Sequence, residues 1–211
     1  MGAGHTRPVL AGGRGRAGAL GDIVAEVLLF HHAHGLTSGC LSFAEELRSA
    51  GHVVHVPDLY EDKTFAELED GVRHAEEVGF DAIIERGRSA SAGLANELVY
   101  LGFSLGALPA QALAQQQPGA RGAVLLGSCN PASEFGPGWP QGVALQIHAM
   151  ERDEWMELEV ARELEATIDG AQLFLYPGDG HLFVDEDLAD YDEDAAALFK
   201  ERVLSLLDDV Q

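Results

Sequence analysis

The stretch LVYLGFSLGALPAQ, from Leu98 to Gln111, decides the fold of this chain of 211 residues. Its first half is a continuous apolar run typical of a buried strand, and its second half has the composition of a helix. Between the halves lies GFSLG, a G-x-S-x-G sequence centred on Ser104. A strand that turns sharply into a helix needs glycines on both sides of the serine, because larger side chains would clash there. We therefore predict that Ser104 is presented at the edge of a sheet. The alternative is an ordinary glycine-rich connection with a serine that caps the helix.

Short apolar runs alternate with helical segments on both sides of this stretch. The expected strands are VAEVLLFH, HVVHV, ELVYLGF, RGAVLLG, GVALQIHAM and AQLFLY. The expected helices cover residues 38–50, 64–79, 81–92, 105–117, 155–168 and 193–207. This alternation predicts right-handed crossovers and an α/β fold with a mostly parallel central sheet and helices on both faces. In such a sheet the chemistry lies at the carboxyl ends of the strands.

Length and composition indicate one domain, which we expect to span residues 23–211. Hydrophobic residues make up 46% of the chain, enough for a sizeable core. Residues 1–22 are rich in glycine and arginine and lack the apolar centre of a secretory signal, so we expect a flexible leader. Residues 13–18 match the G-x-G-x-x-G dinucleotide fingerprint, but the strand and helix that this motif needs are not predicted around it.

The chain is strongly acidic, with 35 Asp and Glu against 13 Lys and Arg and a net charge of -22. Such a surface repels phosphates and anionic lipids, which argues against binding to nucleic acid or membranes. Cys40 and Cys129 have the spacing of neither a disulfide framework nor a zinc site. No apolar run reaches the roughly 20 residues of a membrane span. We expect a cytoplasmic bacterial protein, a monomer or homodimer, whose partner is a small molecule.

A serine nucleophile needs a base, and the base needs an orienting acid. Downstream of Ser104 the only histidines are His148 and His181. His148 lies within an apolar strand, which favours a buried residue. His181 lies in the glycine-rich loop YPGDGHLF after a strand, which is where a general base is expected.

The candidate acid is Asp153, which comes immediately after a predicted strand and before His181, in the chain order of such triads. Its neighbours Glu151 and Glu154 remain alternatives. Asp169 and Asp179 have the surroundings of turn residues.

The stretch HHAHG, residues 31–35, is one candidate for a metal site, because neutral imidazole is a common zinc ligand. A metal-dependent hydrolase that uses His31, His32 and His34 is therefore one alternative. Adjacent residues of an extended segment point to opposite faces, so His31 and His32 should diverge. The H-x-H-x-D-H pattern of metallohydrolases is also incomplete, because Gly35 and Leu36 follow His34. We predict no metal and no other cofactor.

Four segments together resemble the dienelactone hydrolase family of the α/β-hydrolase superfamily. They are EVLLFHHAHGLTSGCLSFAEELRSAGHVVHVPDLY, GFSLG, QIHAMERDEW and LFLYPGDGHLFVDEDLADYDEDAAALFKERVL, in the family's order. The resemblance implies an α/β-hydrolase fold and a triad of Ser104, Asp153 and His181. It also implies an oxyanion hole formed by the backbone amides of Ala33 and Leu105.

The chain departs from the family pattern at three positions. The namesake enzymes have a cysteine nucleophile restrained by a glutamate from the loop after the first strand. Here Ser104 takes the place of the cysteine, and His32 that of the glutamate, which favours ester hydrolysis over thiolate chemistry. We expect His32 to lean toward Ser104 and Gly35 to permit the turn beside it. Asp185, four residues past His181, replaces an arginine that holds the lactone carboxylate, so a dienelactone should be repelled.

We therefore predict a cofactor-free serine hydrolase that cleaves an ester, lactone or thioester through an acyl-enzyme. A catalytically idle α/β-hydrolase scaffold that binds a small molecule is a further alternative. The pocket candidates are His32, His34, Trp155 and Cys129. The structural alternative for Trp155 is a side chain that anchors its helix, and for Cys129 it is a small buried thiol. The acidic run over residues 185–194 lacks the spacing of a calcium loop and fits a solvated loop before a helix.

Overall fold

The computed structural model describes residue 1 and residues 25–210, so the predicted leader beyond Met1 lies outside the described residues. The described chain contains a six-stranded sheet in the order β2-β1-β3-β4-β5-β6. All neighbouring strands are parallel, which confirms the predicted sheet. The strands are β1 (Glu26–Phe30), β2 (Val53–His55), β3 (Leu98–Phe103), β4 (Gly122–Leu126), β5 (Ala144–Met150) and β6 (Gln172–Tyr176).

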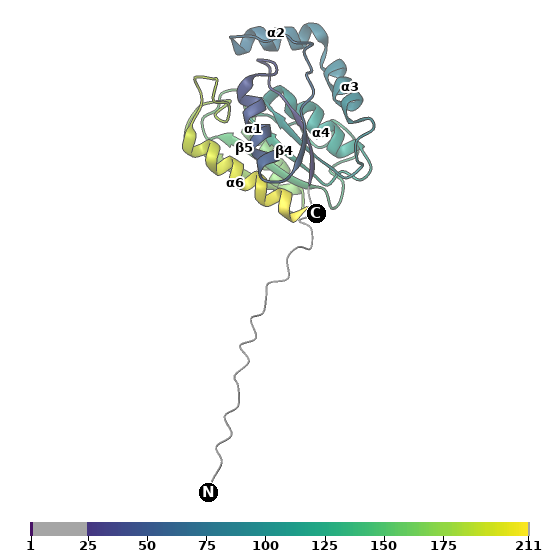
Figure 1. Ribbon diagram of the computed structural model, residues 1–211. Helices are drawn as coiled ribbons and strands as arrows, with labels where there is room; N and C mark the ends of the chain where they lie inside the picture. Colours follow the sequence, from purple (N-terminus) through teal and green to yellow (C-terminus); the bar gives the residue numbers. More distant parts are fainter. Residues whose placement is uncertain (2–24, 211) are drawn as a thin grey trace.

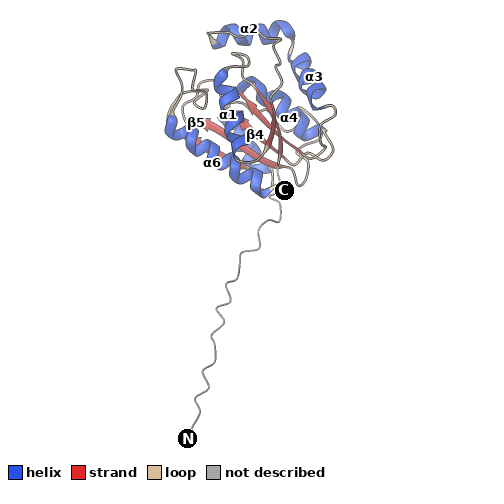
Figure 2. Ribbon diagram, viewed as in Figure 1, coloured by secondary structure: helices blue, strands red, loops and turns tan. Residues whose placement is uncertain are grey.

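Helices follow every strand except β4, which a loop joins to β5, and they lie on both faces of the sheet (Figures 1 and 2). They are α1 (Ser38–Ser49), α2 (Leu68–Val78), α3 (Phe80–Ser91), the 3-10 helix η1 (Ser104–Gly106), α4 (Ala107–Gln116), α5 (Leu158–Thr167) and α6 (Glu193–Asp209). The alternation that the sequence predicted is therefore confirmed.

Two helices begin later than predicted. The sequence places a helix from Thr64, but α2 begins at Leu68, because Glu67 before it is extended, with a φ of -105° and a ψ of 138°. The helix expected from Trp155 begins at Leu158, because Glu157 before it is not helical, with a φ of -78° and a ψ of 78°. In both cases a non-helical residue directly before the first turn sets the start of the helix.

Alternate residues of the strands divide between two hydrophobic clusters, one on each face of the sheet. On one face Leu29 and Leu101 pack with Phe43 of α1 and Phe199 of α6, whose ring centroids are 5.3 Å apart. The other face packs against α3, α4 and α5, through Ile83, Leu113 and Leu164 among others. Burial of each such large side chain contributes roughly 1.5–3 kcal/mol.

The strand order changes direction at β1, since β2 lies on one side of it and β3 to β6 on the other. Open parallel sheets bind their ligands at such a point, beyond the carboxyl ends of the strands. Phe30 of β1 pairs with Gly102 of β3, so the segments that follow these strands lie side by side. The loop after β1 and the serine turn after β3 therefore meet at this point.

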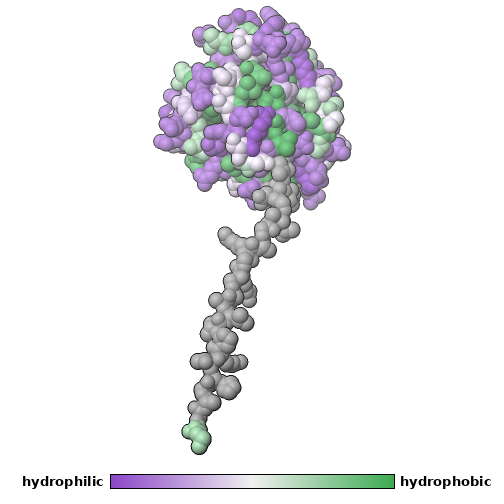
Figure 3. Space-filling view, in the orientation of Figure 1, coloured by the Kyte–Doolittle hydropathy of each residue, from purple (hydrophilic) through white to green (hydrophobic). Residues whose placement is uncertain are grey.

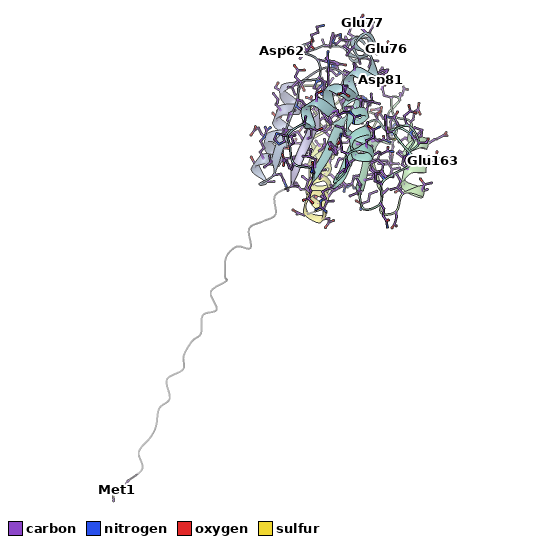
Figure 4. All side chains as sticks on the ribbon, turned by 90° about the vertical axis from the view of Figure 1, so that its right-hand side faces the viewer. Met1, Asp62, Glu76, Glu77, Asp81 and Glu163 are labelled. Atoms are coloured by element: carbon purple, nitrogen blue, oxygen red, sulfur yellow. The ribbon has the colours of Figure 1, made fainter. Side chains whose placement is uncertain are left out.

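The surface carries the acidity that the composition predicts. Hydrophilic residues cover much of the face seen in Figure 3. Figure 4 shows Asp62, Glu76, Glu77 and Asp81 around α2 and α3, at the end of the molecule shown at the top. Among the described residues, no helix combines the length and apolar character that a bilayer crossing requires.

Candidate active site

Ser104 lies on a strained turn between β3 and α4. Its φ of 48° lies in the left-handed region, which a non-glycine residue rarely adopts. A Cβ atom on Gly102 would lie 2.2 Å from the carbonyl oxygen of Gly106, and one on Gly106 would lie 2.2 Å from that of Phe30. Backbone occupies the space on both sides, so both glycines are sterically required.

The structure brings Ser104, His181 and Asp153 into one hydrogen-bonded chain. Nδ1 of His181 donates to Oδ2 of Asp153 over 2.8 Å, and Oγ of Ser104 lies 2.7 Å from Nε2 of His181. Because Nδ1 carries the proton, Nε2 of a neutral ring has the lone pair that accepts from the hydroxyl. The three residues are 9%, 5% and 5% exposed. This arrangement has the geometry of a nucleophile, a base and an orienting carboxylate.

Neighbouring groups fix the orientation of this chain. The amide of Trp155 donates to Oδ1 of Asp153 over 2.9 Å, and the amide of His181 donates to Oδ2 of Asp190 over 3.0 Å. A Cβ atom on Gly127 would lie 2.9 Å from Cε1 of His181, so a glycine gives the ring its space. Of the three acids that the sequence left open, Asp153 is the one bonded to His181; the alternatives, Glu151 and Glu154, are exposed.

His148 is fully buried in β5, as its position in an apolar strand predicts. Its Nε2 donates to Oε1 of Gln146, and its Nδ1 accepts from the hydroxyl of Tyr176 over 2.9 Å. Burial holds its pKa well below the ordinary value for histidine. His148 is therefore a neutral residue of the sheet's interior.

The two candidate oxyanion residues lie in the adjacent segments. Ala33 is fully buried in the loop after β1, and Leu105 follows Ser104 in the first turn of the helical segment, where backbone amides lack intrahelical acceptors. The amide of Gly35 donates to the carbonyl of His32 over 3.0 Å and closes the turn around Ala33. Gly35 has a φ of 93°, so a glycine does permit this turn.

His31 and His34 hold the surrounding loops together. Nδ1 of His31 donates to the carbonyl of His32 over 2.8 Å, and its Nε2 accepts from the amide of Leu59 over 2.9 Å. Nδ1 of His34 donates to the carbonyl of Phe65 over 2.9 Å. Burial lowers the pKa of His31 to about 4, so its ring is neutral. Within residues 25–210, no group of three or more His, Cys, Asp or Glu side chains is arranged to hold a metal ion.

The structure gives His32 a different partner from the one we predicted. Its Nε2 donates to Oδ2 of Asp185 over 2.7 Å, and both side chains are fully buried. Burial raises the pKa of Asp185, but hydrogen bonds from His32 and Thr37 outweigh it and leave the pKa below its ordinary value. Burial also lowers the pKa of His32. The two shifts favour the carboxylate form of Asp185 and the uncharged form of His32.

The prediction of a solvated acidic loop is wrong for part of residues 185–194. Asp185 is 1% exposed, whereas Asp187 and Asp190 are exposed as predicted, although they also accept from the amides of Gly39 and His181. The loop does lead into a helix as predicted, and Asp192 caps α6 by accepting from the amide of Ala195. Sequence alone gave no signal for the long-range bonds, because their partners lie in distant segments.

Trp155 and Cys129 lie in different surroundings. Trp155 lies before the start of α5 and is 48% exposed. Its ring centroid is 6.0 Å from that of His181. Cys129 is 8% exposed within the cluster that packs under α4, and burial raises the pKa of its thiol to about 12. The thiol is therefore protonated and unreactive at neutral pH.

Comparison with models of known protein families identifies the family of this chain. Residues 21–211 match the model of the dienelactone hydrolase family. The chain belongs to the dienelactone hydrolase family. This membership, over nearly the whole chain, supports a hydrolase as the class of activity. No curated protein sequence matches the chain.

Solved structures of other hydrolases share the fold. The dienelactone hydrolase-like promiscuous phosphotriesterase P91 from metagenomic libraries matches with a TM-score of 0.71 and 16% identity, over 88% of this chain and 86% of that one. A dienelactone hydrolase from Anabaena variabilis matches with a TM-score of 0.60 and 18% identity, over 87% and 85%. A pyrethroid hydrolase from Sphingobium faniae matches with a TM-score of 0.60 and 14% identity, over 88% and 98%. At these identities the likeness shows the α/β-hydrolase fold.

Proposed function

We propose that this member of the dienelactone hydrolase family is a serine hydrolase that cleaves an ester, lactone or thioester bond. The observation that carries the proposal is the chain from Ser104 Oγ through His181 to Asp153, with hydrogen bonds of 2.7 and 2.8 Å on a strained turn. A buried serine in such a chain has both an acceptor for its proton and a group that stabilises the resulting imidazolium.

In the first half of the reaction, Ser104 Oγ attacks the carbonyl carbon while its proton moves to Nε2 of His181. Asp153 holds the ring in the required tautomer and stabilises its positive charge. The carbonyl oxygen becomes an oxyanion, for which the amides of Ala33 and Leu105 are the proposed donors. Donors of this kind contribute roughly 2.7–4 kcal/mol each to transition-state stabilisation. His181 then gives its proton to the leaving alcohol or thiol, and the acyl-enzyme remains.

In the second half, water attacks the acyl-enzyme. His181 takes a proton from the water, and the same oxyanion donors serve again. The proton then returns to Ser104 Oγ as the acid leaves. No step requires a cofactor.

The buried charge near the site bears on the substrate. Asp185 is a fully buried acid in the loop that bears His181, and its hydrogen bonds from His32 and Thr37 hold its pKa below the ordinary value. A carboxylate on the acyl group would meet repulsion that water cannot screen well in a buried site. We therefore propose uncharged acyl groups as substrates and not the dienelactone carboxylate.

The test is a panel of esters, lactones and thioesters of differing chain length and charge, assayed with the wild type, Ser104→Ala and Ser205→Ala. Ser205 is exposed on α6 and serves as the matched serine control. We expect hydrolysis of uncharged members, a loss of at least about 10⁴-fold in Ser104→Ala, and none in Ser205→Ala. Full activity of Ser104→Ala would overturn the proposal. A folded wild type that is inert to the whole panel would favour the idle scaffold, and loss of activity with a chelator would favour the metal-dependent alternative.

A further inference from the structure

A second histidine–aspartate pair joins the two loops that flank Ser104. His32 directly precedes Ala33, the proposed oxyanion residue, and Asp185 lies four residues after His181 in the loop that carries the base. Nε2 of His32 donates to Oδ2 of Asp185 over 2.7 Å. The bond therefore connects the loop that supplies the oxyanion amide to the loop that supplies the base.

Further hydrogen bonds cross the same boundary. Oγ1 of Thr37 donates to Oδ2 of Asp185 over 2.6 Å. Asp187 Oδ2 accepts from Oγ of Ser38 over 2.5 Å and from the amide of Gly39 over 2.8 Å. With the His32 bond, these contacts bind the loop of residues 31–39 to the loop of residues 181–187 through two aspartates.

The close approach of the two loops depends on a glycine. A Cβ atom on Gly39 would lie 1.8 Å from Oδ1 of Asp185, well inside the contact distance of real atoms. That same Oδ1 accepts from the amide of Asp187 over 2.9 Å, so the carboxylate is fixed from both loops. Both carboxylate oxygens of Asp185 therefore accept hydrogen bonds in this arrangement.

The second pair differs from the first in the nitrogen that it uses. His32 gives its Nε2 proton to the carboxylate, and its buried Nδ1 has no hydrogen-bond partner in the part of the chain that the structure describes. Ser104 Oγ is already bonded to Nε2 of His181. The bonds of His32 therefore run to the neighbouring loop and not to the nucleophile, which argues against a second base.

We propose that His32 and Asp185 are positioning residues, which clamp the loop after β1 so that the Ala33 amide stays aligned with the oxyanion that forms at Ser104. The inference rests on the proposed hydrolysis. Oxyanion donors act only when they lie within about 0.5 Å of the productive geometry. A loosened loop would weaken transition-state binding more than substrate binding, so kcat should fall while KM changes little.

The variants are chosen to separate clamping from the mere presence of an imidazole. His32→Gln keeps an N–H donor for Asp185 but has no ring. His32→Leu with Asp185→Leu removes the bond from both sides, so that no unpaired carboxylate is buried. His55→Gln is the matched control, because its Nε2 bonds Oε1 of Glu26 over 2.8 Å in a histidine–carboxylate pair on β1 and β2.

We expect the double leucine variant to lose about 10- to 100-fold in kcat with KM within about twofold, since loss of one oxyanion donor lowers kcat by roughly 10²–10³. His32→Gln should recover most of that kcat, and His55→Gln should match the wild type. Affinity for a trifluoromethyl ketone, which forms a tetrahedral adduct, should fall in parallel with kcat. Wild-type kcat in the double variant, or no recovery by glutamine, would overturn the inference.

Amide hydrogen exchange gives a readout that does not depend on turnover. Exchange in residues 31–39 should rise at least about tenfold in the double variant and stay near the wild type in His32→Gln. Unchanged exchange in the double variant would overturn the clamp even if activity fell. An inert wild type with the predicted exchange would overturn the proposed function and leave the clamp standing. If the double variant does not fold, Asp185→Asn takes its place with the same expected directions.

Discussion

The molecule holds two buried histidine–aspartate pairs close to Ser104, and they differ in one chemical detail. In the first, His181 gives its Nδ1 proton to Asp153 over 2.8 Å and presents Nε2 to the serine hydroxyl. In the second, His32 gives its Nε2 proton to Asp185 over 2.7 Å, and its Nδ1 has no partner among the described residues. The same two residue types therefore present a ring nitrogen to a serine hydroxyl in one place and bond two loops together in the other.

The ring nitrogen that bonds the carboxylate decides whether the other nitrogen can accept a proton from a nucleophile. Nε2 is the end of the ring far from the backbone, so a carboxylate at Nδ1 leaves the reaching end free for a nucleophile. A carboxylate at Nε2 uses the reaching end itself, and the lone pair that remains lies close to the residue's own backbone. Residue type alone does not distinguish these roles.

The largest expected difference between the pairs is in catalysis. Asp153→Asn should lower kcat by about 10⁴-fold, because an amide favours the wrong tautomer of His181 while it preserves the geometry. Asp185→Asn should lower kcat by no more than about 100-fold, since it acts only on alignment. Steady-state kinetics on the best uncharged ester measure both values. Equal losses of kcat in the two variants would contradict the distinction between a pair that supplies the base and a pair that positions a loop.

The next effect is on stability, at the point where the loop after β1 touches the serine turn. Gly106→Ala should lower the free energy of unfolding by about 3 kcal/mol, because the added Cβ would lie 2.2 Å from the carbonyl oxygen of Phe30 and 2.7 Å from that of His31. Gly136→Ala is the control, since a Cβ there meets nothing within 4 Å. Urea denaturation measures both, and a Gly106→Ala protein as stable as the control would contradict the close contact.

A third buried histidine, His31, has no acid among the described residues bonded to it at hydrogen-bond distance and differs from both pairs in its effect on stability. Burial lowers the pKa of His31 to about 4, whereas the unfolded chain takes up the proton near the ordinary 6.5. The unfolded state therefore binds more protons as the pH falls from 6.5 toward 4, and stability declines across that range. Between pH 7 and pH 5 this group should remove about 2 kcal/mol.

The matched variant for this prediction is His31→Gln, whose amide can donate to the carbonyl of His32 and accept from the amide of Leu59 without titrating. Denaturation curves at pH 7 and pH 5 should show a shallower decline in the variant than in the wild type. An equal decline in both proteins would mean that His31 titrates no differently in the folded and unfolded states.

The smallest expected effect lies on the open side of the first pair. Trp155 is about half exposed with its ring centroid 6.0 Å from that of His181, so we expect it to pack against aromatic substrates. Trp155→Ala should raise KM for aryl esters about fivefold, near 1 kcal/mol, and leave short alkyl esters unchanged. Trp139→Phe, at the only other tryptophan, is the control. A uniform rise across both ester classes would assign Trp155 a structural role instead.

The sequence predicted those features that depend on local pattern. The apolar runs located the strands, so their carboxyl ends could be found: Ser104 follows β3 directly, and Asp153 and His181 lie in the loops after β5 and β6. The turn at Gly35 followed from its place after β1. Local sequence was less reliable for Trp155, because the helical pattern did not reveal that Asp153 holds its amide.

The second pair could not be predicted from sequence for a physical reason. His32 and Asp185 are separated by 153 positions, and their contact depends on how close two loops approach in the folded chain. The family resemblance shows that Asp185 stands in place of an arginine, but no local pattern indicates that it is buried or that His32 is its partner. The choice between Nδ1 and Nε2 depends on that packing as well.

The most direct test of the central claim, that His181 and Asp153 activate Ser104, is labelling by a fluorophosphonate followed by mass spectrometry of the intact chain and its peptides. We predict one adduct per chain, located on Ser104, equally fast in the wild type and Ser205→Ala. The adduct should be absent in Ser104→Ala and far slower to form in His181→Gln. Labelling that persists in Ser104→Ala, or that proceeds at the wild-type rate in His181→Gln, would contradict the account.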